Sequence, residues 1–136
     1  FRGKKLKERA LFFHFHVYLE AYNVQKDDGK DPLFRTRPGS VIIKGDWKLH
    51  HYFEDNELEL YNLSDDMSES KNLSKINKEI TTRLYNDLDV WRTSNNAPIP
   101  SDKNPKYNQK FVDSLIILIK EKKISGRLNK NLLPIN

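Results

Sequence analysis

The sequence predicts a small α+β domain, with an antiparallel sheet of about four strands packed against one C-terminal amphipathic helix. Short segments of alternating apolar and polar residues are separated by turn residues, which is typical of antiparallel strands. One later segment repeats apolar residues every three or four positions, as an amphipathic helix does. The 136 residues include 7 Phe, 6 Tyr and 2 Trp, enough for one core. No apolar run approaches the ~20 residues of a membrane helix, so no membrane partner is expected.

Residues 9–18 alternate as a strand does. Leu11, Phe13 and Phe15 fall on one face, and His14 and His16 fall on the other together with further aromatic rings. Because both faces carry aromatic residues, we expect this strand to be buried on both sides. A long excursion over residues 19–40 follows. Excursions of that length without regular structure are usually functional.

A strand over residues 41–44 and a return strand over residues 47–53 are joined by Gly45-Asp46. A two-residue loop with glycine first favours a type II′ turn. That turn places Leu49 opposite Ile42 on one face of the sheet.

A second turn at Asp55-Asn56 leads into a strand over residues 57–62. Taken as a two-residue loop, it predicts Phe53 opposite Leu58 and His51 opposite Leu60. These side chains share one face, so the meander is expected to bury that face.

A helix of about five turns is predicted to begin near Asn77 and to end before Pro98. Arg92 lies off its apolar stripe and is expected at the surface. Residues 97–107 contain three prolines and are expected to be extended. The stripe consists of Leu73, Ile76, Ile80, Leu84, Leu88 and Trp91.

The net charge of +5 is unevenly distributed along the chain. Residues 1–9 carry +4 and residues 103–136 carry +6, so the part between them carries −5. A nucleic-acid-binding module needs a basic face on its folded core, so no nucleic-acid partner is expected. We predict one domain over residues 1–107 and a basic tail over residues 108–136, either helical or disordered. Phe111, Leu115, Leu118 and Ile119 would form the apolar face of a helix over residues 108–123.

Few residues suggest chemistry by themselves. His14 and His16, two apart on one strand face, have a spacing that suits zinc if a third ligand is available, but they also suit a polar pocket rim. Arg35 and Arg37 flank a turn and suit an anion, or simply a solvated loop. The chain has no Cys, which excludes disulfides, thiolate metal sites and cysteine nucleophiles within it. No Gly-rich phosphate loop, nucleophile elbow or H-E-x-x-H motif is present.

Several segments, in order over about residues 9–107, resemble the C-terminal subdomain of the formylglycine-dependent sulfatases, the arylsulfatase A-like or N-sulphoglucosamine sulphohydrolase-like group. The strongest are Gly45-Asp46-Trp47-Lys48-Leu49 followed by Glu59-Leu60-Tyr61-Asn62-Leu63. The others are Phe12-Phe13-His14-Phe15, Arg35-Thr36-Arg37-Pro38-Gly39, Glu69, Asn72-Leu73, Trp91, Ala97-Pro98 and Asn104-Pro105-Lys106-Tyr107. Three features depart from the family pattern: His16 stands for a usual Pro, Lys44 for a usual Arg, and 29 residues follow Tyr107.

The resemblance implies hydrolysis of sulfate esters, often of sulfated sugars, by a full-length enzyme. Its nucleophile is a formylglycine made in a Cys/Ser-x-Pro-x-Arg motif, and calcium lies beside it. Neither that motif nor a calcium ligand set occurs in this chain, so its implied partner is an N-terminal catalytic α/β domain. The subdomain would line the rim of the substrate pocket, with His14, His16, Arg35 and Arg37 as candidates for contact with substrate.

Three hypotheses remain open. The chain, which begins at Phe1 without an initiator methionine, is expected to be a piece of a sulfatase that is inactive alone. A second hypothesis is a free-standing module that binds an anionic ligand through Arg35, Arg37 and the histidines. A third is a small zinc enzyme built on His14 and His16.

Overall fold

The computed structural model describes residues 7–20, 33–102 and 104–120. These residues divide into two compact units, each described by itself. Residues 7–16 and 39–99 form the first unit, and residues 17–20, 33–38, 100–102 and 104–120 form the second. None of the described helices is long and apolar enough to cross a bilayer.

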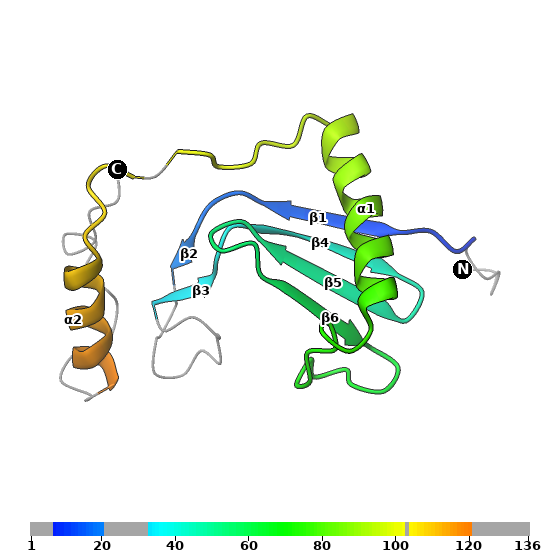
Figure 1. Cartoon of the computed structure of the whole chain (residues 1–136), viewed down its shortest axis with the longest axis horizontal. Helices are drawn as coiled ribbons and strands as arrows, with labels where there is room; N and C mark the ends of the chain where they lie inside the picture. The colour runs from blue at the N-terminus through cyan, green and yellow to red at the C-terminus, as the bar shows by residue number, and fades with distance from the viewer. Residues whose placement is uncertain (1–6, 21–32, 103, 121–136) are drawn as a thin grey trace, which may run out of the picture. The chain divides into compact units, whose positions relative to one another are not determined.

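The first unit is a four-stranded antiparallel sheet with one helix across one of its faces (Figure 1). Its strands are β1 (Leu11–Phe15), β4 (Gly39–Lys44), β5 (Trp47–Tyr52) and β6 (Leu58–Asn62), in the spatial order β1-β4-β5-β6. The helix is α1 (Lys78–Ser94). The predicted α+β class with about four strands is confirmed.

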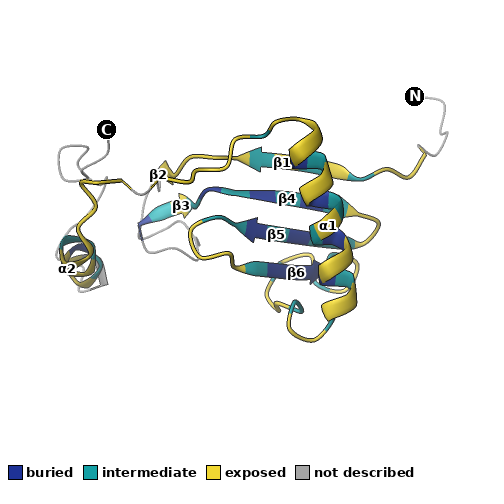
Figure 2. Cartoon of the chain, turned by 45° about the horizontal axis from the view of Figure 1, so that its top comes forward, coloured by how far each residue is buried: buried dark blue, intermediate teal, exposed yellow. Residues whose placement is uncertain are grey.

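The core lies between α1 and the sheet, along the three strands β4, β5 and β6 (Figure 2). It rests on one row of cross-strand neighbours whose apolar side chains face α1, and Leu84 and Leu88 of the helix close over that row. Burying an aliphatic side chain of this size contributes about 1.5–3 kcal/mol. The row consists of Phe12, Ile42, Leu49 and Leu60, the last three with no exposed surface.

The β4–β5 hairpin has the predicted two-residue loop. Lys44 pairs with Trp47 and Ile42 pairs with Leu49. Gly45 has a φ of +58°. A positive φ at the first loop position is what a type II′ turn requires, and glycine adopts it without steric cost.

The β5–β6 register differs from the prediction. His51 pairs with Leu58 and Leu49 pairs with Leu60, so the predicted pairing is wrong by two residues. The backbone N–H of Tyr52 donates to the carbonyl of Glu57 at 2.9 Å, which makes the connection longer than a two-residue loop. A shift of two residues keeps every side chain on its predicted face, because the side-chain period of a strand is two.

Strand β1 is not buried on both sides as expected. Its α1-facing residues Phe12 and His14 are half-buried. On the opposite face, Leu11, Phe13 and Phe15 are 42%, 53% and 41% exposed. The strand alternates as predicted, but α1 covers only one face of this sheet.

Helix α1 begins after Asn77 and has Asn95 as its C-cap, as the sequence predicts. Leu73 and Ile76 precede the helix, and Ile76 is 68% exposed. Arg92, expected at the surface, is only 3% exposed. The reason is a polar partner on the sheet: His51 faces α1 from β5 and hydrogen-bonds the Arg92 guanidinium at 2.7 Å.

The second unit contains the ribbon β2 (Leu19–Glu20) and β3 (Phe34–Thr36), and the helix α2 (Gln109–Lys120). The strands pair antiparallel. Among the described residues of this unit, Leu33 and Leu115 form a buried apolar cluster with Phe111 packed against it, whereas Leu118 is 37% exposed. Residues 21–32 of the excursion and the segment 121–136 lie outside the described residues, and the proposed boundary at residue 107 stays a prediction.

Truncating the helix core should destabilise the first unit far more than truncating its surface. We expect Leu84→Ala to lower the free energy of unfolding by about 2–5 kcal/mol, because Leu84 is fully buried. Arg83→Ala, at the exposed neighbouring position of the same helix, should change it by about 0.5 kcal/mol or less. Urea midpoints measure both variants, and equal midpoints would contradict the packing described here.

Candidate functional site

His14 links β1, β4 and the segment after α1. Its Nε2 lies 2.9 Å from the carbonyl oxygen of Pro98, and its Nδ1 lies 2.8 Å from the hydroxyl of Ser40. A carbonyl oxygen can only accept, so Nε2 donates to it, and Nδ1 is left for the hydrogen bond with the Ser40 hydroxyl. Ser40 is 1% exposed, so this hydroxyl depends on a protein partner. Both nitrogens of His14 are therefore used within the unit.

His16 is exposed, and its ring stacks on that of His14 with the centroids 5.8 Å apart. A zinc ion on His14 would have to displace one of the two hydrogen bonds just described. Among the described residues, no group of three or more His, Cys, Asp or Glu is arranged to hold a metal ion. The geometry around His14 therefore favours a structural role in this unit.

Arg35 and Arg37 belong to the second unit, whereas His14 and His16 belong to the first. Arg35 is exposed at the middle of β3. Arg37 follows the strand and is half-buried. The contact of these four residues with a substrate stays a prediction.

A cluster that the sequence did not predict surrounds Arg92 on the α1 side of the sheet. The guanidinium hydrogen-bonds His51 Nδ1 and donates to Asp89 Oδ1 at 2.9 Å. It also lies over the rings of Phe53 and Tyr85, with centroid distances of 5.8 and 5.5 Å. Arginine is a donor only, so His51 Nδ1 must accept, and Nε2–H is left to donate to the amide oxygen of Asn56 at 3.3 Å.

The electrostatics of this cluster keep His51 neutral. Burial lowers the pKa of His51, and the positive charge of Arg92 lowers it further, against the opposing hydrogen bond to Asn56. Protonating Nδ1 would also remove the acceptor that Arg92 uses. The cluster therefore joins α1 to β5 only in the neutral form of the histidine.

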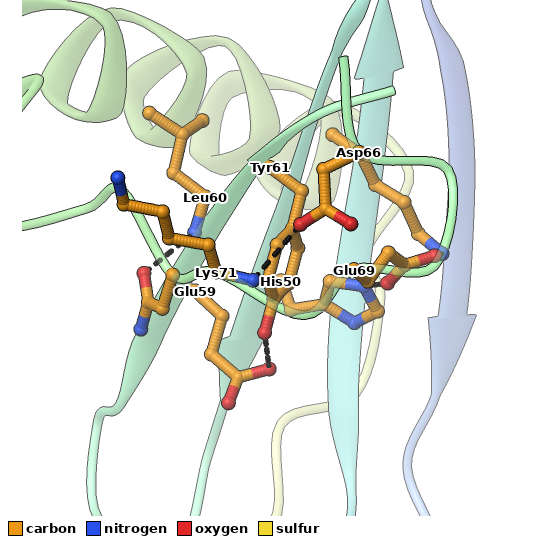
Figure 3. A network of polar contacts seen from close by, with 9 residues as sticks. His50, Glu59, Leu60, Tyr61, Asp66, Glu69 and Lys71 are labelled. Atoms are coloured by element: carbon orange, nitrogen blue, oxygen red, sulfur yellow. Dashed lines mark hydrogen bonds and ion pairs between the residues drawn. The ribbon is translucent and has the colours of Figure 1, made fainter. Parts of the chain in front are cut away.

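A second unpredicted cluster lies on the opposite face of the sheet, away from α1 (Figure 3). Glu69 receives hydrogen bonds from Lys48 Nζ at 2.6 Å and from His50 Nε2 at 3.1 Å. Burial raises the pKa of Glu69, but the bonds and charges of Lys48 and His50 outweigh it, so that the net pKa is lowered. Burial also lowers the pKa of His50, and Lys48 adds to that shift. Nearby, the Tyr61 hydroxyl donates to the buried carboxylate of Glu59 at 3.0 Å.

The loop that carries Glu69 is held by its own polar side chains. Asp66 accepts hydrogen bonds from Ser68, Ser70 and the backbone N–H of Lys71, and the backbone hydrogen bonds hold its pKa at about 2 (Figure 3). Asn72 accepts from the Leu60 N–H. Glu69 itself has a φ of 57°, an uncommon conformation for a residue other than glycine. The loop thus places Glu69 against Lys48 and His50 at some conformational cost.

Part of each cluster can be predicted from the sequence. Strand alternation places Lys48 and His50 on one face, and Glu69 is among the residues that carry the sulfatase resemblance. What the sequence does not reveal is the distant partner of each histidine, Arg92 in the first cluster and Glu69 in the second. Arg92 and Glu69 reach their histidines across 41 and 19 residues of sequence, and no local pattern encodes such contacts.

Comparison with known proteins finds sulfatases among the proteins similar to this chain. No protein-family profile matches the chain. A protein named Sulfatase from Formosa agariphila is 33% identical over 101 residues, which is 67% of this chain and 16% of that protein. A crystallised candidate sulfatase from Bacteroides thetaiotaomicron has a similar fold, with a TM-score of 0.55 and 27% sequence identity. The similarity covers 77% of this chain and 21% of the Bacteroides chain.

These similarities define the class of protein. The chain belongs to the sulfatase family, and it corresponds to the C-terminal subdomain of that family. It spans about a sixth of the curated relative and about a fifth of the solved one.

Removing His14 should destabilise the first unit. His14→Ala leaves the buried Ser40 hydroxyl without its partner, and an unsatisfied buried group costs about 1–3 kcal/mol. His16→Ala removes an exposed neighbouring ring and should cost about 0.5 kcal/mol or less. Thermal and urea melts compare the two variants. A His14 variant as stable as the His16 variant would show that the bridge to Ser40 and Pro98 contributes nothing.

Stability should fall as the pH drops below about 6.5, the ordinary histidine value. His50 and His51 have lowered pKa values in the folded chain, so between those values and 6.5 the unfolded chain binds more protons. Full stability is therefore expected above pH 6.5, with a loss as the pH falls through the folded values. Asp66 and Glu69 act only at lower pH, because their ordinary values are 3.8 and 4.5.

Urea midpoints at about pH 7.5 and about pH 5.5 measure this loss. A variant carrying His50→Gln and His51→Gln should show a smaller difference between the two midpoints, whereas His16→Gln should keep the wild-type difference. A wild-type midpoint that does not change between the two pH values would contradict the assignment of neutral, buried histidines.

Proposed function

We propose that this chain is the C-terminal portion of a sulfatase that hydrolyses sulfate esters, with sulfated sugars as the substrate class. Its role would be to pack on the N-terminal catalytic domain and to form part of the substrate-pocket rim. The observation that carries the proposal is the 33% identity to a sulfatase over 101 residues, in a chain with the fold of a candidate sulfatase.

The chemistry of ester hydrolysis is assigned to the rest of the enzyme. Sulfatases of the resembled group use a formylglycine nucleophile and a calcium ion. This sequence has no Cys and no Ser-x-Pro-x-Arg motif that could give the formylglycine. The described residues offer no group of three acidic or histidine side chains for a metal, so they do not fit the calcium site. No catalytic step is therefore derived for residues of this chain.

Binding at the rim is the contribution that its own side chains support. His16 and Arg35 are exposed, and a guanidinium suits bidentate contact with a sulfate oxygen pair. Contacts with remote parts of a substrate add binding energy that orients the reacting group. His14 fits such a role less well than His16, because both of its ring nitrogens already have protein partners.

The 136-residue chain should show no sulfatase activity by itself. Ester hydrolysis needs an activated nucleophile and stabilisation of the developing charge, and this sequence encodes neither. Purified chain assayed with an aryl sulfate and calcium should match the buffer blank. Turnover that persists through repurification would overturn the proposal.

The coding sequence upstream of residue 1 provides the complementary test. We expect it to continue in frame through a Cys/Ser-x-Pro-x-Arg motif a few hundred residues earlier, the size of a large α/β domain. Arg35→Ala in that complete protein should then raise the KM for a sulfated sugar more than for a small aryl sulfate. An in-frame stop codon directly upstream would instead favour a free-standing module.

A further inference from the structure

We infer that the sheet face opposite α1 is the surface by which this subdomain docks on the rest of the sulfatase polypeptide, through an apolar strip formed by Leu11, Phe13 and Phe15. The inference rests on the proposed function and adds which face is covered and by what chemistry. The partner surface is apolar where it meets the strip.

The strip is a contiguous apolar surface. Its three side chains project from alternate positions of β1, on the side away from α1. They are 42%, 53% and 41% exposed. On the same face, Val41 is the cross-strand neighbour of Phe13, and Ile43 is that of Leu11. Adjacent apolar residues exposed to this extent are typical of a surface that another protein segment covers.

On β5, the same face carries polar residues whose charges are paired. Along the same cross-strand rows, Val41 is followed by His50 on β5, and Ile43 is followed by Lys48. Glu69 pairs with both, and the side chains of Lys48, His50 and Glu69 are 20%, 16% and 28% exposed. A charge costs most on burial when it has no partner, so this half of the face can be covered without that penalty.

The lengths of the relatives indicate which protein segment covers the strip. The matched segment is 16% of the Formosa sulfatase and 21% of the Bacteroides protein, so each relative has most of its chain outside it. Interfaces between domains of one chain commonly bury about 600–1,500 Å². β1 is also an edge strand, hydrogen-bonded in the sheet only to β4. The outer edge of β1 would lie at the border of such an interface.

Thiol labelling can test this inference directly, because the chain has no cysteine of its own. Phe13→Cys places a thiol in the strip, and Val90→Cys places one on α1 at a residue that is 66% exposed. Both variants are labelled with a maleimide, first in the 136-residue chain and then in the complete sulfatase, and the labelled peptide is identified by mass. Circular dichroism melts check that both variants fold.

In the complete enzyme, Phe13→Cys should react more slowly than in the 136-residue chain by roughly tenfold or more, because the core of an interface excludes water. Val90→Cys should react equally in both. Equal reactivity of Phe13→Cys in both proteins would overturn the inference. Protection of the Phe13→Cys thiol from the maleimide already in the 136-residue chain would also overturn it. Sedimentation would then show whether a second copy of the chain or the chain itself covers the strip.

Sulfatase activity of the complete protein, measured in parallel on sulfated sugars and on an aryl sulfate, separates the two proposals. An active enzyme in which Phe13→Cys stays fully reactive rejects the docking face and keeps the proposed function. A complete protein without sulfatase activity rejects the proposed function, whatever the labelling result.

Discussion

The first unit depends on a single row of cross-strand contacts, Phe12, Ile42, Leu49 and Leu60, closed by Leu84 and Leu88 of α1. This row ties the four strands to the helix. A slip of one residue in any strand would turn its member to the other face and open the core. The neighbouring row facing α1 is different in kind: it contains His14, Ser40 and His51, so the helix must meet polar groups as well as apolar ones.

That polar row explains why a cation is buried in so small a core. Arg92 covers His51, and the rings of Phe53 and Tyr85 enclose its guanidinium. Its Nε has no hydrogen-bond partner among the described residues, so the cluster is not ideally satisfied. A buried charge pair adds little net stability to a fold, but removing one of its partners is strongly destabilising because it leaves the other charge buried alone. Arg92 does, however, fix the position of α1 against β5, because the bond to His51 has a direction and apolar contacts do not.

Local patterns were sufficient for the faces of the sheet and for the helix, since each follows from periodicity over a few residues. The β5–β6 register was not accessible in this way: the apolar positions repeat every two residues, so a shift of two satisfies the pattern equally well. The length of the connection after Tyr52 decides between them, and turn residues alone do not specify it. The burial of Arg92 and the position of Glu69 depend on partners distant in sequence, which no periodicity reveals.

Most of the histidines of this subdomain have hydrogen-bond partners within it. Of its four histidines, His14, His50 and His51 are hydrogen-bonded to groups of the same unit, and only His16 is exposed. Arg92 and Glu69 are likewise paired within it. These hydrogen bonds hold the histidines, Arg92 and Glu69 in place and join the strands of the unit to its helix and loops. The exposed groups of the first unit include His16 and the apolar residues of β1, and Arg35 is exposed in the second unit. Exposed apolar side chains suit association with another protein segment, and an exposed guanidinium suits contact with an anion.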